Sequence, residues 1–579
     1  MMQNADALRE ILHRIDHRGY PAYKDTQGVY QFQTKTKDGR KVSYFLAIDH
    51  VQGDPFASPS RVSVRILGQD AGFPRKLYEN TEARVMLQDE LLREFGTALS
   101  RISFQTRGSG KSGLMSVVNP GQEILERTAC QIDPEQGNLI LRMEVGFPAH
   151  GRTVDSRALE KMLFGLLPGC VGESLYASSL PEARLRQGYE LSQNQKAIRE
   201  QLEENGLVAF VANGSILPRK SGVSQLPMRE AVPFVSPRTL ETEMNVPYGK
   251  PIRGMGIPKG VTLIVGGGYH GKSTLLEALE RGVYNHIARD GREYVITEDS
   301  AVKLRAEDGR RVEQVDISMF IGDLPNGKDT HAFSTEDASG STSQAAGMVE
   351  AMEAGSHTFL IDEDTSATNF MIRDELMQRV VSPDAEPITP FVNRVRQIYE
   401  TQGISTILVA GSSGSYFQEA DVIVQMDRYV PVDITAKAKK VAAEFPADRK
   451  NDLPVHPVRF HRVGQAVAPN PRTKVKCVGM DTISIDRENI DVRYLEQLVD
   501  PGQLRMLGQL LVRLTRSGMD GRTDMCELVG MISGGFAERI PGRLVPVEQT
   551  DKISGSLADV RVQEVFAAIN RYRSVRIKG

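Results

Sequence analysis

The sequence is poor in cysteine, and none of its cysteines are paired by spacing. Its four cysteines are widely separated, and no C-x-x-C motif is present: Cys130, Cys170, Cys477 and Cys526. The pattern therefore indicates neither a zinc site nor a disulfide framework. Free thiols in a reducing compartment are the simplest interpretation, so we expect the protein to be cytoplasmic.

Long hydrophobic runs and an excess of positive charge are also lacking. No apolar run approaches the roughly 20 residues that a membrane-spanning helix needs, and the charged N-terminal segment has no signal-peptide core. We therefore expect no membrane association. The formal net charge of −3 over 579 residues argues against a uniformly basic nucleic-acid binder. The length allows roughly three or four domains.

The strongest signal that is present lies at 261–276, VTLIVGGGYHGKSTLL. Val261–Val265 is an apolar, β-branched run typical of a buried strand, and the segment from Leu275 has helical composition. The residues between them fit the motif G-x-x-x-x-G-K-[ST]. The predicted nucleotide-binding loop, called the P-loop below, comprises Gly266, Gly267, Gly268, Tyr269, His270, Gly271, Lys272, Ser273 and Thr274.

The residue types of the P-loop suit a nucleoside triphosphate. Glycines let backbone N–H groups surround phosphates without a Cβ in the way, and the helix N-terminus adds positive potential. Lys272 can reach the β and γ phosphates, which gives it a catalytic role, and the Ser273 hydroxyl can ligate Mg²⁺. The sequence thus predicts binding of ATP with Mg²⁺.

A second apolar run, 358–361, ends in two carboxylates, Asp362 and Glu363. The carboxyl end of a parallel strand is where a second magnesium-holding group belongs. We expect Asp362 to hold Mg²⁺, directly or through water, and Glu363 to act as general base on the attacking water. The alternative is an exposed acidic turn after a core strand.

The segment 338–344, ASGSTSQ, resembles the L-S-G-G-Q signature element of ABC ATPases. Ser339 lies 23 residues before Asp362 (362 − 339 = 23), as in the ABC pattern. In that family such a helix N-terminus binds the γ-phosphate held by the other protomer. We call the corresponding residues of this chain the signature run: Ser339, Gly340, Ser341 and Thr342.

Longer segments resemble the soluble family of predicted ATPases of the ABC class. The likeness covers most of the chain and is most specific between about 245 and 430, in runs such as GGGYHGKSTLLEALERGVYNH, FSTEDASGSTSQAA and IDEDTSATNFMIRDELM. The resemblance implies an ATP-binding domain flanked by family-specific N- and C-terminal domains. It also implies homodimers, and RNA binding has been attributed to members.

The chain departs from the ABC pattern at the switch histidine and at the glutamine loop, where the run DISMFIGDLPNGKDT contains no glutamine. The switch histidine should follow the strand 406–409, but Gly411, Ser412 and Ser413 stand there, which predicts slow turnover. An aromatic residue upstream of the P-loop should stack on adenine, and Tyr248 is the best candidate.

We predict an α/β fold, a P-loop NTPase core of the ABC ATPase type with additional α+β N- and C-terminal domains. The expected domains are 1–245, with a Pro/Gly/Ser-rich connection at 213–245, then 246–436 and 437–579. Basic residues outside the core either contact nucleic acid or form a solvated face: Arg107 and Lys111 in a loop expected to be flexible, and Arg459, Arg462 and Lys474.

The combined prediction is a soluble, Mg²⁺-dependent ATPase that works as a nucleotide-sandwiched homodimer, with RNA or another nucleic acid as a further partner. One alternative is a nucleic-acid clamp in which ATP acts mainly as a switch. A small-molecule kinase would use the same P-loop but gives no reason for the signature run. A transporter subunit is disfavoured because the extra domains are large.

Overall fold

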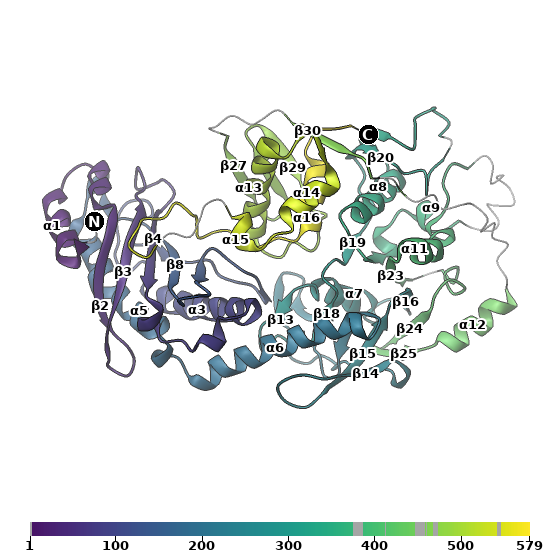
Figure 1. Ribbon diagram of the computed structural model, residues 1–579, viewed down its shortest axis with the longest axis horizontal. Coiled ribbons are helices and arrows are strands. Elements are labelled where there is room, and N and C mark those ends of the chain that lie inside the picture. The colour runs from purple at the N-terminus through teal and green to yellow at the C-terminus, as the bar shows by residue number, and fades with distance from the viewer. Residues whose placement is uncertain are drawn as a thin grey trace. The chain divides into compact units, whose positions relative to one another are not determined.

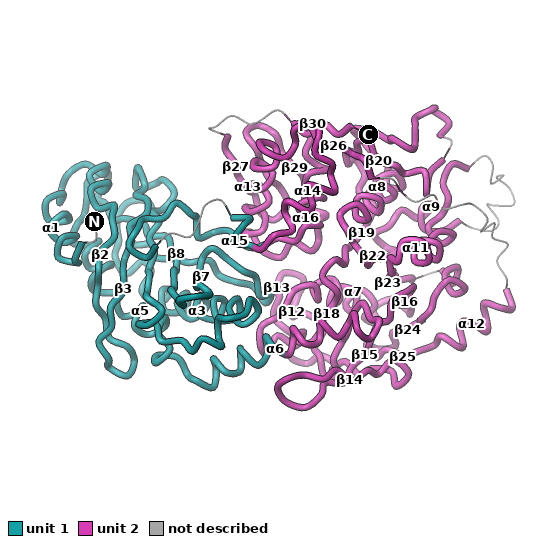
Figure 2. The backbone as a smooth tube through the Cα atoms, in the orientation of Figure 1, with its two compact units in different colours: residues 1–193, 536–559 teal, residues 194–535, 560–579 magenta. Residues whose placement is uncertain are grey.

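The computed structural model describes residues 3–322, 324–373, 386–411, 413–445, 458, 460–466, 473–540 and 546–578. The chain forms two compact units (Figure 2). Unit 1 comprises Met1–Gln193 and Phe536–Asp559, and unit 2 comprises Asn194–Gly535 and Val560–Gly579. The predicted boundaries near 245 and 436 stay predictions, since these units divide the chain differently. In the described ranges, no helix is both long and apolar enough to cross a membrane.

Unit 1 is built on a sheet with strand order β1-β2-β3-β4-β8-β5, in which β7 also pairs with β8. Strands β2, β3, β4 and β8 of this sheet are labelled in Figure 1. All pairings are antiparallel except that of the short β1 with β2. Strand-like runs in the sequence at 28–34, 43–48 and 61–66 and the alternating run 139–145 predict four of these strands, and the structure confirms them. Their bounds are β1 (Gln3–Asn4), β2 (Gly28–Lys35), β3 (Lys41–His50), β4 (Ser60–Ile66), β5 (Met115–Ser116), β7 (Cys130–Ile132) and β8 (Leu139–Val145).

Helices of unit 1 bury apolar stripes in the same core as the sheet. Asn4 caps α1 (Ala5–Ile15) by accepting a hydrogen bond from Ala7 N, and Leu8, Leu12 and Ile15 are buried. Asn80 caps α3 (Thr81–Ile102) in the same way. The helical pattern of the sequence at 156–167 predicts one helix. The structure extends it to Ser174, as α4 (Ser156–Glu160), a π-helical stretch (Lys161–Leu166) and α5 (Leu167–Ser174).

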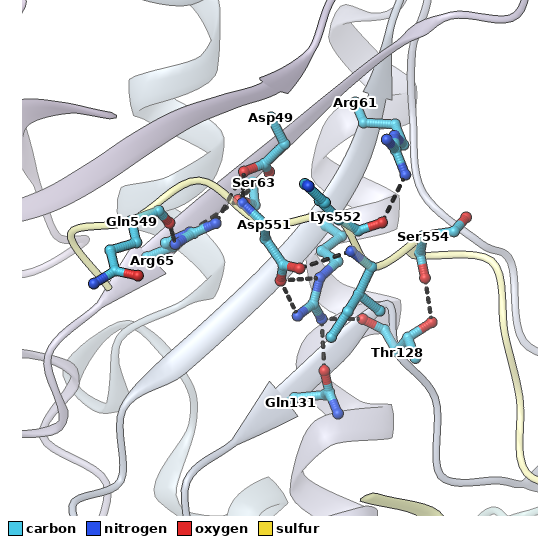
Figure 3. A network of polar contacts seen from close by, with 12 residues as sticks. Asp49, Arg61, Ser63, Arg65, Thr128, Gln131, Gln549, Asp551, Lys552 and Ser554 are labelled. Atoms are coloured by element: carbon cyan, nitrogen blue, oxygen red, sulfur yellow. Dashed lines mark hydrogen bonds and ion pairs between the residues drawn. The ribbon is translucent and has the colours of Figure 1, made fainter. Parts of the chain in front are cut away.

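A segment from late in the chain, 546–559, packs on this sheet through a buried ion pair and several hydrogen bonds (Figure 3). Arg142 on β8 donates from Nε to Asp551 Oδ2 at 3.0 Å, and its Nη1 donates to Thr128 O. Arg65 on β4, 0% exposed, pairs with Asp49 at 3.0 Å. Part of the predicted C-terminal domain therefore belongs to the N-terminal unit.

The centre of unit 2 is a six-stranded sheet with order β19-β22-β23-β16-β24-β25. Its neighbouring strands run parallel except at the β24–β25 hairpin, as expected for an α/β core. The strands are β16 (Val261–Val265), β19 (Val302–Leu304), β22 (Thr358–Asp362), β23 (Ser405–Ala410), β24 (Val422–Asp427) and β25 (Val430–Asp433). The associated helices are α7 (Lys272–Arg281), α8 (Gly340–Glu353), α9 (Thr368–Met371), α11 (Val395–Gln402) and α12 (Thr435–Glu444).

An antiparallel sheet with order β14-β15-β11-β18 accompanies this core in unit 2. Helix α6 (Glu182–Glu204) crosses the boundary between the units and places Ile198 and Leu202 among the buried residues of this sheet. The strands are β11 (Leu207–Ala212), β14 (Glu241–Met244), β15 (Ile252–Pro258) and β18 (Val295–Thr297), with a separate hairpin, β12 (Arg219–Ser221) and β13 (Ser224–Pro227).

The remaining elements of unit 2 form small sheets and helices. Strands β20 (Arg310–Val315) and β21 (Phe333–Ala338) pair ahead of α8. The C-terminal part has two three-stranded sheets, β30-β26-β31 and β27-β28-β29. Its elements are β26 (Val463–Ala466), β27 (Val475–Val478), β28 (Thr482–Ile485), β29 (Glu488–Asp491), α13 (Pro501–Ser517), β30 (Asp520–Asp524), α14 (Met525–Ile532), α16 (Val562–Arg571) and β31 (Val575–Lys578).

The buried pair in unit 1 generates a stability prediction. Arg142→Met keeps most of the side-chain volume but leaves the Asp551 carboxylate buried without its cation, which should cost about 3–5 kcal/mol of unfolding free energy. Arg152→Met is the matched control, because Arg152 is 77% exposed and pairs with Asp54 at the surface. It should cost at most about 1 kcal/mol. Urea unfolding measures the loss of unfolding free energy in each variant. Equal losses would contradict the claim that the buried Arg142–Asp551 pair matters more than the exposed Arg152–Asp54 pair.

Candidate nucleotide-binding site

Strand register places the P-loop and the two carboxylates at one edge of the central sheet. Ile264 on β16 and Asp362 on β22 both pair with Val409 of the intervening strand β23. The three strands run parallel, so their carboxyl ends coincide. Gly266 and Glu363 therefore leave the sheet at the same edge, where α/β proteins bind ligands.

The backbone of the P-loop requires glycine at two positions, because φ is positive at both and one of them lies against a neighbouring carbonyl oxygen. Gly266 has φ 138°, and a Cβ on it would lie 2.5 Å from the carbonyl oxygen of Met426. Gly271 has φ 95°. Tyr269, between them, also adopts a positive φ of 63°, and its side chain is 99% exposed. The loop thus keeps an open inner face, as phosphate binding needs.

Lys272 opens helix α7 and faces the loop. Its Nζ lies 2.7 Å from Gly266 O and 2.9 Å from Gly267 O, so the ammonium group sits over the loop. The helix N-cap, Gly271, provides no side-chain acceptor for the first-turn N–H groups. Ammonium and helix amides together form an anion-binding arrangement.

The carboxylates at the end of β22 differ in environment. Asp362 is 6% exposed, and its Oδ1 accepts a hydrogen bond from Asp364 N at 3.1 Å. Glu363 Oε2 accepts a hydrogen bond from Gly411 N at 2.6 Å. Gly411 is the residue at the expected switch-histidine position, so its backbone holds Glu363 at the end of β23. Ser412 lies outside the described residues.

The donor set suits a hard divalent cation. Ser273 supplies an exposed hydroxyl in the first turn of α7, and Asp362 supplies a carboxylate at the same sheet edge. Among the described residues, no group of three or more His, Cys, Asp or Glu side chains gathers as a metal site. Mg²⁺ would therefore need phosphate oxygens and water to complete its shell.

The signature run forms the N-terminus of α8, as predicted. Ser339 is the N-cap, and its hydroxyl accepts a hydrogen bond from Thr342 N at 3.5 Å. The Ser341 hydroxyl donates to Asn369 Oδ1 at 2.8 Å. Ser339 is exposed, and Gly340 and Thr342 are half-buried. This helix terminus therefore presents a small polar surface to solvent.

A buried glutamine links the signature helix to the loop after Glu363. Gln344 of α8 donates from Nε2 to Ser366 Oγ at 3.0 Å and accepts at Oε1 from Ala367 N at 2.9 Å. The loop is thereby tied to both the signature helix and the strand that carries Asp362.

The other predicted contact residues lie in varied settings. Tyr248, partly exposed, exchanges two backbone hydrogen bonds with the Asn194 side chain. Arg107 and Lys111 are exposed. Their loop is less free than expected, because Ser109 N donates to Ala149 O at 2.8 Å and Lys111 N to Pro55 O at 2.9 Å.

Arg462 is a correction among the proposed nucleic-acid contacts. It is 5% exposed, and its Nε donates to Glu353 Oε2 at 2.8 Å, so its charge does not reach solvent. Lys474 is exposed. Arg459 lies outside the described residues.

Two residues of the β24–β25 turn contact the P-loop, and sequence reasoning missed them. Arg428 N donates to His270 Nδ1, and Tyr429 N donates to His270 O, each at 3.1 Å. No motif marks this turn, and 158 residues separate Arg428 from His270. Only the pairing of β24 beside β16 brings them together.

Three family models match the chain in succession. Residues 5–178 match the N-terminal domain of ATPases of the ABC class, and residues 181–460 match the P-loop domain of ABC ATPases. Residues 474–578 match the MRB1590 C-terminal domain.

A curated relative resembles part of the chain. It is the uncharacterized protein MJ1628 of Methanocaldococcus jannaschii, 34% identical over 229 residues. The match covers 38% of this chain and 50% of the relative, so the chain spans about half the length of that protein.

The matched models repeat the order of domains that the resemblance implied, and the P-loop model covers the central sheet of unit 2 together with Lys272, Asp362 and Glu363. The fold prediction, an α/β P-loop core with added N- and C-terminal domains, is therefore confirmed. The chain belongs to the family of ATPases of the ABC class.

Proposed function

We propose that the chain binds ATP with Mg²⁺ at the P-loop and hydrolyses it to ADP and phosphate. The observation that carries the proposal is the common sheet edge at which the P-loop, Asp362 and Glu363 end. Membership of a P-loop ATPase family supports nucleotide binding.

Each side chain has a definite task in this proposal. Lys272, whose ammonium group lies over the loop, neutralises charge on the β and γ phosphates. Ser273 and Asp362 would hold Mg²⁺, which supplies further charge neutralisation when bound. Glu363 accepts the proton of the attacking water. Its hydrogen bond from Gly411 N holds one carboxylate oxygen at the end of β23.

We further propose that two copies of the chain enclose the nucleotides. Ser339 is an exposed helix N-cap, a small polar group suited to the γ-phosphate of a second protomer. The Gln344 bridge to Ser366 and Ala367 would couple that contact to the strand of Asp362. ATP would then close the dimer, and hydrolysis would release it.

RNA remains the proposed macromolecular partner. The exposed cations Arg107, Lys111 and Lys474 lie outside the central sheet and provide phosphate contacts. With a net charge of −3, such contacts must be local rather than spread over the whole surface.

A second candidate function is a nucleic-acid clamp in which ATP is mainly a switch and hydrolysis is slow. The glycine at the switch-histidine position favours it, because Gly411 offers Glu363 a backbone N–H but no cationic side chain near the γ-phosphate. Turnover measured with and without RNA separates the two functions: a constitutive ATPase needs no RNA, whereas the clamp stays slow.

The general-base assignment predicts a selective loss of hydrolysis. Glu363→Gln keeps an oxygen that can accept from Gly411 N but cannot take a proton, so turnover should fall by about a hundredfold or more. ATP binding should persist, as measured by calorimetry. Asp364→Asn, a change at the exposed neighbouring carboxylate, should keep turnover within about twofold, while Lys272→Ala should abolish ATP binding. Normal turnover in Glu363→Gln would remove this residue from the mechanism.

The dimer predicts complementation between two inactive variants. Ser339→Arg should block ATP-dependent dimerisation and hydrolysis, because a long cation replaces a small N-cap, yet nucleotide should still bind the single chain. Mixed with Lys272→Ala, it should regain part of the activity through one intact composite site. Light scattering measures ATP-dependent dimerisation, and phosphate release measures hydrolysis. Normal hydrolysis by Ser339→Arg alone would assign the signature run to its own protomer's site.

The proposed RNA contacts predict a change in salt dependence. Arg107→Gln combined with Lys111→Gln, and separately Lys474→Gln, should weaken RNA binding and lower the slope of log K against log salt by about one for each lost phosphate contact. Arg186→Gln, at an exposed position on α6, is the control and should leave the slope unchanged. Fluorescence anisotropy over a salt series measures it. Unaltered slopes throughout would leave these residues as a solvated face.

A further inference from the structure

The turn between β24 and β25 has an unusual backbone for its residues. Arg428 has φ 49° and Tyr429 has φ 71°, two consecutive left-handed residues in a two-residue hairpin. Such turns favour Asn and Gly, which tolerate this backbone. Large side chains at both positions indicate that something other than the turn selects them.

This turn is docked on the P-loop. Both of its N–H groups donate to His270, at Nδ1 and at the carbonyl oxygen. A Cβ placed on Gly271 would lie 3.0 Å from Tyr429 Cδ1, so the tyrosine ring packs directly against that glycine. The ring therefore has a rigid backing at the first residue before α7.

The Tyr429 ring is nevertheless 51% exposed. One part rests on the P-loop and the rest faces solvent, so the ring offers an aromatic surface beside the phosphate-binding loop. Tyr269 differs, because it is 99% exposed and its ring rests on little of the protein. Of these two rings, only Tyr429 is held in place by its surroundings.

The strand order gives the direction in which a nucleotide must lie. Asp362 and Glu363 follow β22, on one side of β16, and β24 lies on the other side. The γ-phosphate has to approach the carboxylates, so the ribose and base extend away from them, toward β24 and its turn. The base thus arrives at the side of the P-loop where Tyr429 lies.

We propose that Tyr429 is the stacking platform for the nucleobase, a positioning residue that rests on the proposed function of ATP binding. Stacking uses the face of a base and not its hydrogen-bonding edge. The site should therefore accept purine nucleoside triphosphates in general, with ATP and GTP bound within a few-fold of each other. In the sequence, the position of Tyr248 upstream of the P-loop predicts that this residue stacks on the base. In the present proposal, Tyr429 makes that contact instead.

Calorimetry of the full chain with Mg²⁺ and ATP, GTP or inorganic tripolyphosphate tests the proposal. Tyr429→Ala should weaken ATP and GTP about 5- to 100-fold, the range for losing one base–aromatic stack, and leave tripolyphosphate unchanged. Tyr429→Phe, which keeps the ring, should bind all three like the unaltered chain. Tyr429→Gly relieves the left-handed backbone and should reproduce the alanine result.

Other outcomes overturn the proposal without ambiguity. ATP binding by Tyr429→Ala within twofold of the unaltered chain would show that the base lies elsewhere, as would a larger ATP loss in Tyr248→Ala. An equal loss of ATP and tripolyphosphate in Tyr429→Gly would make the residue a support for the loop. Lys272→Ala distinguishes the underlying function: if it still binds both ATP and tripolyphosphate, the P-loop proposal itself fails.

Discussion

The parallel pairing of β16, β23 and β22 is the constraint on which the site depends. These strands are buried on both faces, and their register sets Ile264 and Asp362 level with each other through Val409. A shift of one residue would turn the Asp362 side chain to the opposite face of the sheet. The proposed catalytic arrangement therefore depends on the backbone hydrogen bonds between these strands. The catalytic side chains themselves do not set their relative positions.

Two sets of hydrogen bonds connect this edge of the sheet to neighbouring elements of unit 2. On one side, His270 accepts both N–H groups of the β24–β25 turn, which fixes the turn against the P-loop. On the other, Gln344 joins the signature helix to the loop that follows the carboxylates. A change at either end of the nucleotide would thus reach a neighbouring element through one or two hydrogen bonds.

The signature helix is also tied to the C-terminal part of unit 2. Glu350 and Glu353 of α8 pair with Arg310 and Arg462, and Arg462 also donates to Asn570 Oδ1 on α16 at 3.0 Å. Burial of these charges is tolerated because each has an opposite charge. Arg462 therefore holds elements together, a task that its place in a basic stretch of sequence did not suggest.

Patterns among neighbouring residues were enough to predict the local parts of this protein. Motif spacing defined the P-loop, apolar runs defined β16 and β22, and strand-like runs defined β2, β3, β4 and β8 of unit 1, because each signal lies within a few neighbouring residues. Tertiary structure alone decided three other features. Asp551 reaches Arg142 across 409 positions, Arg462 reaches Glu353 across 109, and Arg428 reaches His270 across 158. Such contacts leave no periodic trace in the sequence, because they depend on which strands pair and on which charges that pairing buries.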